Sequence, residues 1–425
     1  MRADIIGILI LSVCVFLFVT KKLSPSVVGC LGCIAMVLCN VATFEEAFSG
    51  FSSNIVLLMV SSMIVGIAMF KTGTAQIIGR LIIKWAHGSE RTFLLASCFI
   101  AGCLAMFLAN TAVLAAFIPI VDSVCKTSEN MKQRNIILPL AYAVMYGGCC
   151  TLIGCTPQLT ANGLMNKMVG IEMGMWDLTA PGLCLFVLFL LYMSLFGYKH
   201  GEKIWGHREE VDIHIDNEKR DSVLKTQYDK KKVTIMLIII TFMIIFYIFS
   251  IIPIAETAIC AALLCVLFDC CNVKDIIKEL SWDTIVFLAT CLGIANALTA
   301  AQSADLIGVF VSRLLGNISS PFLIFAILVL LTIMISQFIT NSTAIIIVLP
   351  IAISICDIYG FSYMTFCVGI TLAASIACCT PLAAAQITMT EVAGYEFNDY
   401  IRYGWILTLL SYVGIIFTVP LFFPF

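Results

Sequence analysis

Two apolar stretches of this 425-residue chain are interrupted in the same way. One reads AMFLANTAVLAAFIP, where Asn110 and Thr111 break the apolar run and a Pro stands nine residues after the Asn. The other reads SQFITNSTAIIIVLP, where Asn341 and Ser342 make the break and the Asn-to-Pro spacing is the same. An Asn in hydrocarbon surroundings is costly unless it serves helix packing or a site. Because packing gives no reason to repeat the spacing 231 residues later, the pair predicts one site built from two halves.

The composition places the chain in a membrane. Hydrophobic residues make up 61% of it, and charged residues make up 12%, against about 25% in typical soluble proteins. We therefore expect a polytopic all-α membrane protein that contacts lipid, with no nucleic-acid partner. The 20 Cys stand mostly singly or as adjacent pairs in apolar runs, which suits reduced, buried thiols. Without paired CxxC or His-x-x-x-His motifs, no metal cluster is expected.

The apolar runs predict four spans in each half of the chain, beside the interrupted stretches. A span needs about 20 apolar residues. The first run is not read as a signal peptide, because no small-x-small cleavage site follows it. The expected spans are 5–20, 23–41, 54–70, 181–198, 233–251, 254–269, 284–300 and 403–421. Amphipathic stretches at 71–91 and up to Leu315 are expected to lie along the membrane surface.

The interrupted stretches predict hairpins that do not cross the membrane. Residues 92–121 are too long for one upright span, and basic residues flank both ends. Charges of one sign at both ends favour a re-entrant hairpin with Asn110 at its tip. Residues 320–357 form the matching hairpin around Asn341.

A broken helix comes after each hairpin. Residues 136–170 contain Thr156-Pro157, and residues 363–391 contain Thr380-Pro381. A Thr-Pro pair inside a hydrophobic segment marks a discontinuous helix whose freed backbone groups face a cavity. Each half thus has five crossings, counting the broken helix, and one hairpin.

This repetition predicts two inverted repeats. We expect the first at 1–199, a hydrophilic cytoplasmic linker at 200–232 within the polar loop 199–232, and the second repeat at 233–425. An odd number of crossings inverts the second half, so the hairpins enter from opposite faces. The loops that are then cytoplasmic hold 21 of the 24 Lys and Arg, as the positive-inside rule requires. Both termini are expected outside, in a bacterial cytoplasmic membrane.

The tips and the breaks are expected to meet near the membrane midplane. Helix N-termini favour anions, and unwound carbonyl groups favour a small cation. No Asp, Glu, His, Lys or Arg stands beside either tip or either Thr-Pro pair, which favours sodium over a proton as the coupling ion. The expected substrate contacts are Asn110, Thr111, Thr156, Pro157, Asn341, Ser342, Thr343, Thr380 and Pro381.

These motifs resemble the divalent anion/sodium symporter family of the ion transporter superfamily. The resemblance rests on ANT at 109–111, TNST at 340–343, GGCCTLIGCTP at 147–157 and CCTP at 378–381. It implies a homodimer with a fixed scaffold, made from the first spans of each half, and a moving domain that carries both hairpins. The sodium contacts that it implies, partly through backbone carbonyls, are Ala109, Asn110, Cys155, Ser336, Ile339, Asn341 and Cys379.

The chain departs from the family pattern at the first tip and after both Thr-Pro pairs. The family's first tip Ser is Ala109 here, and an upstream hydroxyl position is Ala105. The usual Thr-Pro-Pro-Asn is shortened in both halves to a Thr-Pro followed by other residues. We therefore expect the sodium site at Asn110 to be weaker than the one at Asn341.

The function expected from these patterns is sodium-coupled uptake of a small divalent organic anion, such as a C4-dicarboxylate, by an elevator-type secondary transporter. The alternatives are a sodium/sulfate symporter, an anion exchanger, and a proton-coupled relative of the arsenite-pump or sodium/proton-antiporter type. The last would be expected to carry an acidic residue where Thr111 stands. An enzyme is not expected, because the chain has no His pair, Asp dyad or activated Ser.

Overall fold

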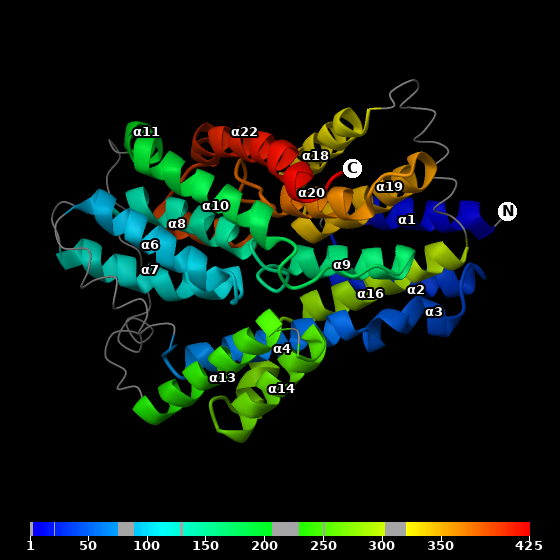
Figure 1. Ribbon diagram of the computed structural model, residues 1–425, viewed down its shortest axis with the longest axis horizontal. Coiled ribbons are helices and arrows are strands. Elements are labelled where there is room, and N and C mark those ends of the chain that lie inside the picture. The colour runs from blue at the N-terminus through cyan, green and yellow to red at the C-terminus, as the bar shows by residue number, and fades with distance from the viewer. Residues whose placement is uncertain are drawn as a thin grey trace.

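The computed structural model describes residues 3–20, 22–74, 89–127, 131–205, 229–249, 251–301 and 320–425. These residues are almost all helical, and none of them lies in a strand (Figure 1). Six helices within the described ranges are long and apolar enough to cross a membrane, and six shorter apolar helices accompany them. The all-α fold class expected from the composition is confirmed.

The first half contains eleven described α-helices and 3-10 turns, and one π-helical turn. They are α1 (Ala3–Thr20), α2 (Pro25–Leu38), α3 (Phe44–Phe48), the 3-10 turn η1 (Ser49–Ser52), α4 (Asn54–Lys71), α6 (Glu90–Ala105), α7 (Asn110–Thr127), α8 (Gln133–Gly148), α9 (Thr156–Val169), α10 (Thr179–Tyr192) and α11 (Tyr198–Trp205). A π-helical turn, Met193–Gly197, joins α10 to α11. Gly170, at φ +70°, ends α9, because a left-handed residue closes a helix and glycine adopts that conformation freely.

The second half has a similar order. Its elements are α13 (Lys230–Phe249), α14 (Ile254–Leu267), α15 (Val273–Glu279), α16 (Trp282–Ala300), α18 (Pro321–Ser336), α19 (Asn341–Tyr359), α20 (Tyr363–Ser375), α21 (Ala385–Thr388), the 3-10 turn η3 (Met389–Ala393) and α22 (Phe397–Phe422). Gly360, at φ +71°, ends α19 in the same way that Gly170 ends α9.

The polar contacts divide the described helices into two bodies. The first body comprises α1–α4 and α13–α16, and the second comprises α6–α11 and α18–α22. In the first body, Lys71 Nζ lies 2.6 Å from Glu279 Oε1, and Asn296 Nδ2 donates to the Glu46 carbonyl over 3.2 Å. In the second body, Arg134 Nε donates to the Ala393 carbonyl over 2.9 Å. Each body is therefore held together by contacts between the two halves of the sequence.

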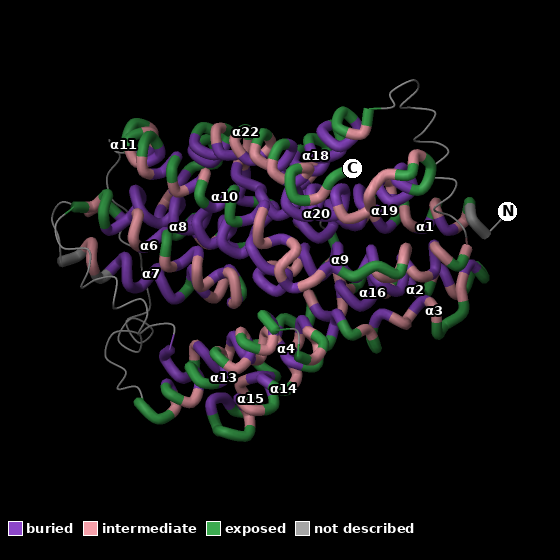
Figure 2. The backbone as a smooth tube through the Cα atoms, in the orientation of Figure 1, coloured by how far each residue is buried: buried purple, intermediate pink, exposed green. Residues whose placement is uncertain are grey.

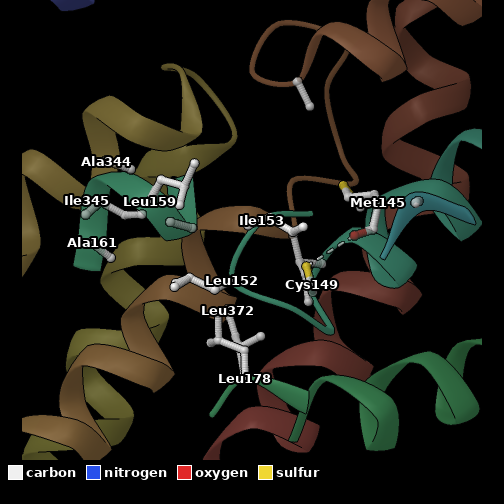
Figure 3. Packing of buried hydrophobic residues seen from close by; sticks show 14 of the residues in the cluster. Met145, Cys149, Leu152, Ile153, Leu159, Ala161, Leu178, Ala344, Ile345 and Leu372 are labelled. Atoms are coloured by element: carbon white, nitrogen blue, oxygen red, sulfur yellow. Dashed lines mark hydrogen bonds between the residues drawn. The ribbon is translucent and has the colours of Figure 1, made fainter. Parts of the chain in front are cut away.

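The two bodies meet through a mainly apolar surface. Helix α9 packs on α16 and α4, and α19 touches α1. Figure 3 shows Leu159 and Ala161 of α9 beside Ala344 and Ile345 of α19, so α9 lies between the first body and the second hairpin. Among hydrogen bonds that join described residues, one crosses between the bodies: Trp176 Nε1 donates to the Tyr247 carbonyl over 3.0 Å.

Several expected boundaries differ from the structure. The linker predicted at 200–232 overlaps two helices at its edges, because α11 continues to Trp205 and α13 begins at Lys230; residues 206–228 lie outside the described part of the chain. Trp205 is 1% exposed and donates from Nε1 to Asn135 Oδ1, so burial and a hydrogen bond extend the helix past the expected end of the span. The amphipathic helix expected at 71–91 falls mostly outside the described residues, and so does the stretch before Leu315.

Candidate functional site

Two helical hairpins carry the repeated Asn residues. Helices α6 and α7 are joined by residues 106–109, and α18 and α19 by residues 337–340. In each hairpin the Asn is the first residue of the second helix, Asn110 in α7 and Asn341 in α19. The two hairpins lie toward opposite ends of the long axis of the molecule (Figures 1 and 2). The second tip is the more buried one: residues 341–346 are all buried, whereas only Leu108 and Asn110 are buried among residues 106–112.

The first tip contacts the first break. Asn110 is 8% exposed, and its Nδ2 donates to Cys155 Sγ over 2.9 Å. Its Oδ1 is buried and accepts no hydrogen bond from a described residue. Gly148 permits this close approach, because a methyl group placed on it would lie 2.5 Å from Asn110 Oδ1 and 2.7 Å from Cys155 Sγ. A buried amide oxygen without a donor is costly, and it is well suited to bind a cation or a donor group of a substrate.

The second tip contacts the second break in a parallel way. Asn341 is 9% exposed, and its Nδ2 donates to the Ser375 carbonyl over 3.4 Å. Its Oδ1 is again buried and accepts no hydrogen bond within the described structure. In both halves, therefore, the amide nitrogen is used by the break and the amide oxygen is left available.

The hydroxyl groups near the second tip have local partners. Thr340 caps α19 by accepting from the Thr343 backbone N–H over 3.4 Å, and the two hydroxyls lie 2.6 Å apart. Ser336 Oγ donates to the Ile333 carbonyl over 2.9 Å. Ser342 and Ile339, which also belong to the second tip, are buried. At the first tip, Ala109 is exposed and Thr111 is half-buried.

The two breaks differ in the structure that comes after them. Cys155 is extended, and α9 begins at Thr156 with Pro157 in its first turn, as a proline-containing helix start favours. In the second half α20 ends at Ser375, and no helix resumes at Thr380; the next described helix is the four-residue α21, which begins at Ala385. The helical break within residues 363–391 is thus longer than the break within residues 136–170.

A capping residue accounts for this difference. Gln158 Oε1 accepts from the Cys155 backbone N–H over 2.8 Å and closes the start of α9. The residue after Thr380-Pro381 is Leu382, whose side chain has no acceptor atom. The second break is held instead from the hairpin tip: Gln337 Oε1 accepts from the Cys379 N–H over 2.8 Å, and Thr380 Oγ1 donates to the Gln337 carbonyl.

Sequence reasoning missed three residues of this site: Gly148, Gln158 and Gln337. The two glutamines carried a signal, because a polar side chain inside an apolar run requires a partner. Their partners are backbone groups of the breaks, and the sequence alone does not reveal which ones. Gly148 stands out in the sequence only as part of a helix break, although its role is to bring Asn110 close.

One buried carboxyl group belongs to the first hairpin. Helix α7 continues to Thr127 and so contains Asp122, which lies beyond the end expected at 121. Asp122 is 0% exposed, and its Oδ1 accepts from Gln133 Nε2 over 2.8 Å. It lies about three turns of helix away from Asn110, and it contacts Gln133 of α8, whereas Asn110 contacts Cys155. The described residues contain no cluster of three or more His, Cys, Asp or Glu that could hold a metal ion.

Two protein families match this chain. Residues 15–343 match the family described as citrate transporter, and residues 279–423 match the family described as Na+/H+ antiporter. The first match covers more than half of the sequence and includes both hairpin tips.

Individual relatives are also transporters. The uncharacterized transporter YfbS of Escherichia coli is 30% identical over 199 residues, which are 47% of this chain and 32% of YfbS. The match thus spans about a third of that relative. The sodium-dependent dicarboxylate transporter SdcS of Staphylococcus saprophyticus is 21% identical over 454 residues, which cover 98% of this chain and 86% of SdcS. The solved structure of the YdaH transporter of Alcanivorax borkumensis has the same fold, with a TM-score of 0.64 at 13% identity over 91% of this chain and 88% of YdaH.

Proposed function

Since this chain belongs to the citrate transporter family, we propose that it takes up a small divalent organic anion together with sodium. Its relatives are membrane transporters and not enzymes, so transport itself follows from the family. The observation that carries the proposal is the pair of buried amide oxygens, Asn110 Oδ1 and Asn341 Oδ1, one at each hairpin tip. Neutral amide and carbonyl oxygens are suitable ligands for sodium, and the neighbouring hydroxyl and backbone N–H groups are suitable donors to carboxylates.

The proposed substrate is a C4-dicarboxylate rather than sulfate. Two tips, each with an amide and a hydroxyl, offer separate donors to two carboxylates a few carbons apart. SdcS, which is similar over nearly the whole chain, is described as a sodium-dependent dicarboxylate transporter. We propose that the sodium contacts are Asn110, Asn341 and the backbone carbonyls of Cys155 and Cys379, with Ser336 and Ile339 contributing to the second site.

The division into two bodies supports an elevator-type movement. The second body carries both hairpins and both breaks, and one hydrogen bond between described residues joins it to the first. We infer that the second body moves as a unit against the first, and that the protein is a homodimer built through the first body.

We also propose inverted repeats at 1–199 and 233–425, with the connection between α11 and α13 on the cytoplasmic side and both termini outside. Epitope tags inserted after Asp229 and after Ser320 should be detected from opposite sides of the membrane.

Uptake into proteoliposomes tests the function. The purified protein is expected to accumulate labelled succinate or malate when sodium is high outside, and not when choline replaces sodium. Unlabelled sulfate and citrate are tested as competitors. Sodium-driven sulfate uptake that succinate and malate do not inhibit would overturn the proposed substrate.

A proton-coupled antiporter is the second candidate. Residues 279–423 match the Na+/H+ antiporter family, and Asp122 and Asp399 are buried in the second body. Neither carboxyl group contacts a tip residue among the hydrogen bonds described, and for this reason we favour sodium symport. A pH gradient imposed without a sodium gradient distinguishes the two, because an antiporter would then move sodium in the absence of any organic anion.

A further inference from the structure

In both halves, one glutamine side chain braces the peptide that precedes the Thr-Pro pair. Gln158 accepts from the Cys155 N–H over 2.8 Å and donates from Nε2 to the Gly148 carbonyl over 2.8 Å. Gln337 accepts from the Cys379 N–H over 2.8 Å and donates from Nε2 to the Ile333 carbonyl over 3.1 Å. Each glutamine thus links the N–H of a break to a carbonyl at the end of a helix.

The two glutamines do not occupy equivalent positions in the sequence. Gln158 directly follows Thr156-Pro157, where the second half has Leu382. Gln337 ends the first arm of its hairpin, where the first half has Met106 at the same distance from the Asn. The same contact is therefore made from the break in one half and from the hairpin tip in the other.

Burial makes these contacts strong enough to fix the local backbone. Gln158 is 0% exposed and Gln337 is 4% exposed, so neither amide can exchange its partners for bulk water. In the second break the preceding peptide is held at both ends, because the Cys378 carbonyl also accepts from the Tyr142 hydroxyl over 2.7 Å. With that peptide fixed, the direction of the following carbonyl, at Cys155 or Cys379, is restricted as well.

We propose that Gln158 and Gln337 are a matched pair of positioning residues that hold the Cys155 and Cys379 carbonyls toward the transported cation. This role rests on the proposed sodium coupling, and it adds two side chains that do not themselves touch the ion. Helix α18 and the second break are tied together by Gln337, so the second hairpin and its break hold one geometry. In the first half the brace lies within the broken helix, and the hairpin contacts it separately through Asn110.

Exchanging residues between the two halves of the chain tests this role, because one substitution removes the glutamine contact and a second restores it from another position. Gln337→Met gives the second tip the residue of the first tip, and Leu382→Gln gives the second break the residue of the first break. Leu382 is 49% exposed, so a glutamine has room there. We expect Gln337→Met to raise the sodium concentration for half-maximal uptake about fivefold to tenfold, as the loss of one or two buried hydrogen bonds implies. The double variant Gln337→Met/Leu382→Gln should return to within about twofold of the parent.

A matched control and a second readout complete the test. Gln386 is buried in α21, and its side chain makes no hydrogen bond to a described residue, so Gln386→Met should leave sodium dependence unchanged. Hydrogen exchange of the peptide 376–384, measured by mass spectrometry, should be faster in Gln337→Met and restored in the double variant. This second readout does not depend on transport.

The outcomes separate the brace from the proposed function. A parent protein without sodium-dependent uptake would overturn the proposed function. Hydrogen exchange would still show whether the Gln337 side chain holds the peptide before Thr380-Pro381 in place. Parent-like sodium dependence and exchange in Gln337→Met would overturn the brace, and so would a double variant that shows no rescue. If Gln337→Met does not fold, the mirror pair Gln158→Leu and Gln158→Leu/Met106→Gln decides by the same two measurements.

Discussion

The hydroxyl of Tyr142, on the helix that leads into the first break, donates to the backbone carbonyl of Cys378 in the second break over 2.7 Å. Tyr142 is completely buried, so the bond is shielded from water. It connects α8, which ends at the first break, directly to the second break within the second body. A substitution at one tip is therefore expected to alter the other tip, so the effects of substitutions at the two tips on uptake should not be additive.

The first prediction concerns the two Asn side chains. Asn110→Ala and Asn341→Ala should each lower uptake at least about tenfold, because each removes an oxygen proposed to bind the transported species. Uptake is measured in proteoliposomes, and thermal unfolding in detergent reports on folding. The double variant should lower uptake by less than the product of the two single effects, since both side chains are proposed to act on one site. Full uptake in either single variant would rule out the two-tip site, and loss of folding would indicate a packing role.

The second prediction concerns the space beside Asn110. Gly148→Ala should impair uptake nearly as strongly as Asn110→Ala, because the added methyl group would lie 2.5 Å from Asn110 Oδ1. Gly66→Ala, in α4, is the matched control, since a methyl group there meets nothing within 4 Å. It should leave uptake unchanged and raise the free energy of unfolding by about 0.4–1 kcal/mol. Equal behaviour of the two variants would show that Asn110 tolerates displacement.

The third prediction concerns the unequal tips. Ala109→Ser should lower the sodium concentration for half-maximal uptake, because it adds an oxygen at the tip that is proposed to bind sodium more weakly. It should also stabilise the protein by about 0.5–2 kcal/mol, since a serine before Asn110 can cap α7. Thr340→Ala should raise the sodium requirement and remove the existing cap of α19.

Thr340→Ser is the matched control, because it keeps the hydroxyl on which both the cap and the proposed sodium contact depend and removes only a methyl group; both properties should stay near those of the parent. Sodium titrations of uptake and thermal unfolding are compared for all three variants. If Ala109→Ser and Thr340→Ala change stability without changing sodium dependence, these positions act as caps alone.

The fourth prediction concerns the contact between the two bodies. Trp176→Phe removes the N–H that donates to the Tyr247 carbonyl and keeps an aromatic ring against Phe107. Losing a bond worth about 1 kcal/mol should shift the balance between conformations about fivefold away from the one described here. Spin labels at the exposed residues Glu172 and Lys274, attached through unnatural amino acids because of the 20 native cysteines, report the distance between the bodies. An unchanged distance distribution would show that this bond does not select a conformation.

The sequence predicts the helices and hairpins well because apolar length and interruption are local properties. The interruptions at Asn110 and Asn341 are indeed the starts of new helices. The sequence does not predict that α9 is a full helix while α21 has four residues, since α9 begins with a hydrogen bond from the Cys155 N–H to Gln158 Oε1 that is visible only in the folded chain. Nor does it predict the partners of Gln337, because the Cys379 N–H lies 42 residues away and only the folded chain brings it near.

The surface between α9 and the first body has a mechanical consequence. At Gly163 of α9, the heavy atoms nearest to an added methyl group would be methyl carbons of Leu292 in α16 and of Ile55 in α4. Dispersion forces are short-ranged and carry no preferred direction, so such a surface resists separation more than it resists sliding. If the second body slides against the first as proposed, the rate of that movement should depend on side-chain bulk along α9 and on temperature, and hardly at all on ionic strength. A single methyl group added at Gly163 would crowd this surface, so Gly163→Ala should slow every transport cycle without altering the affinity for any solute.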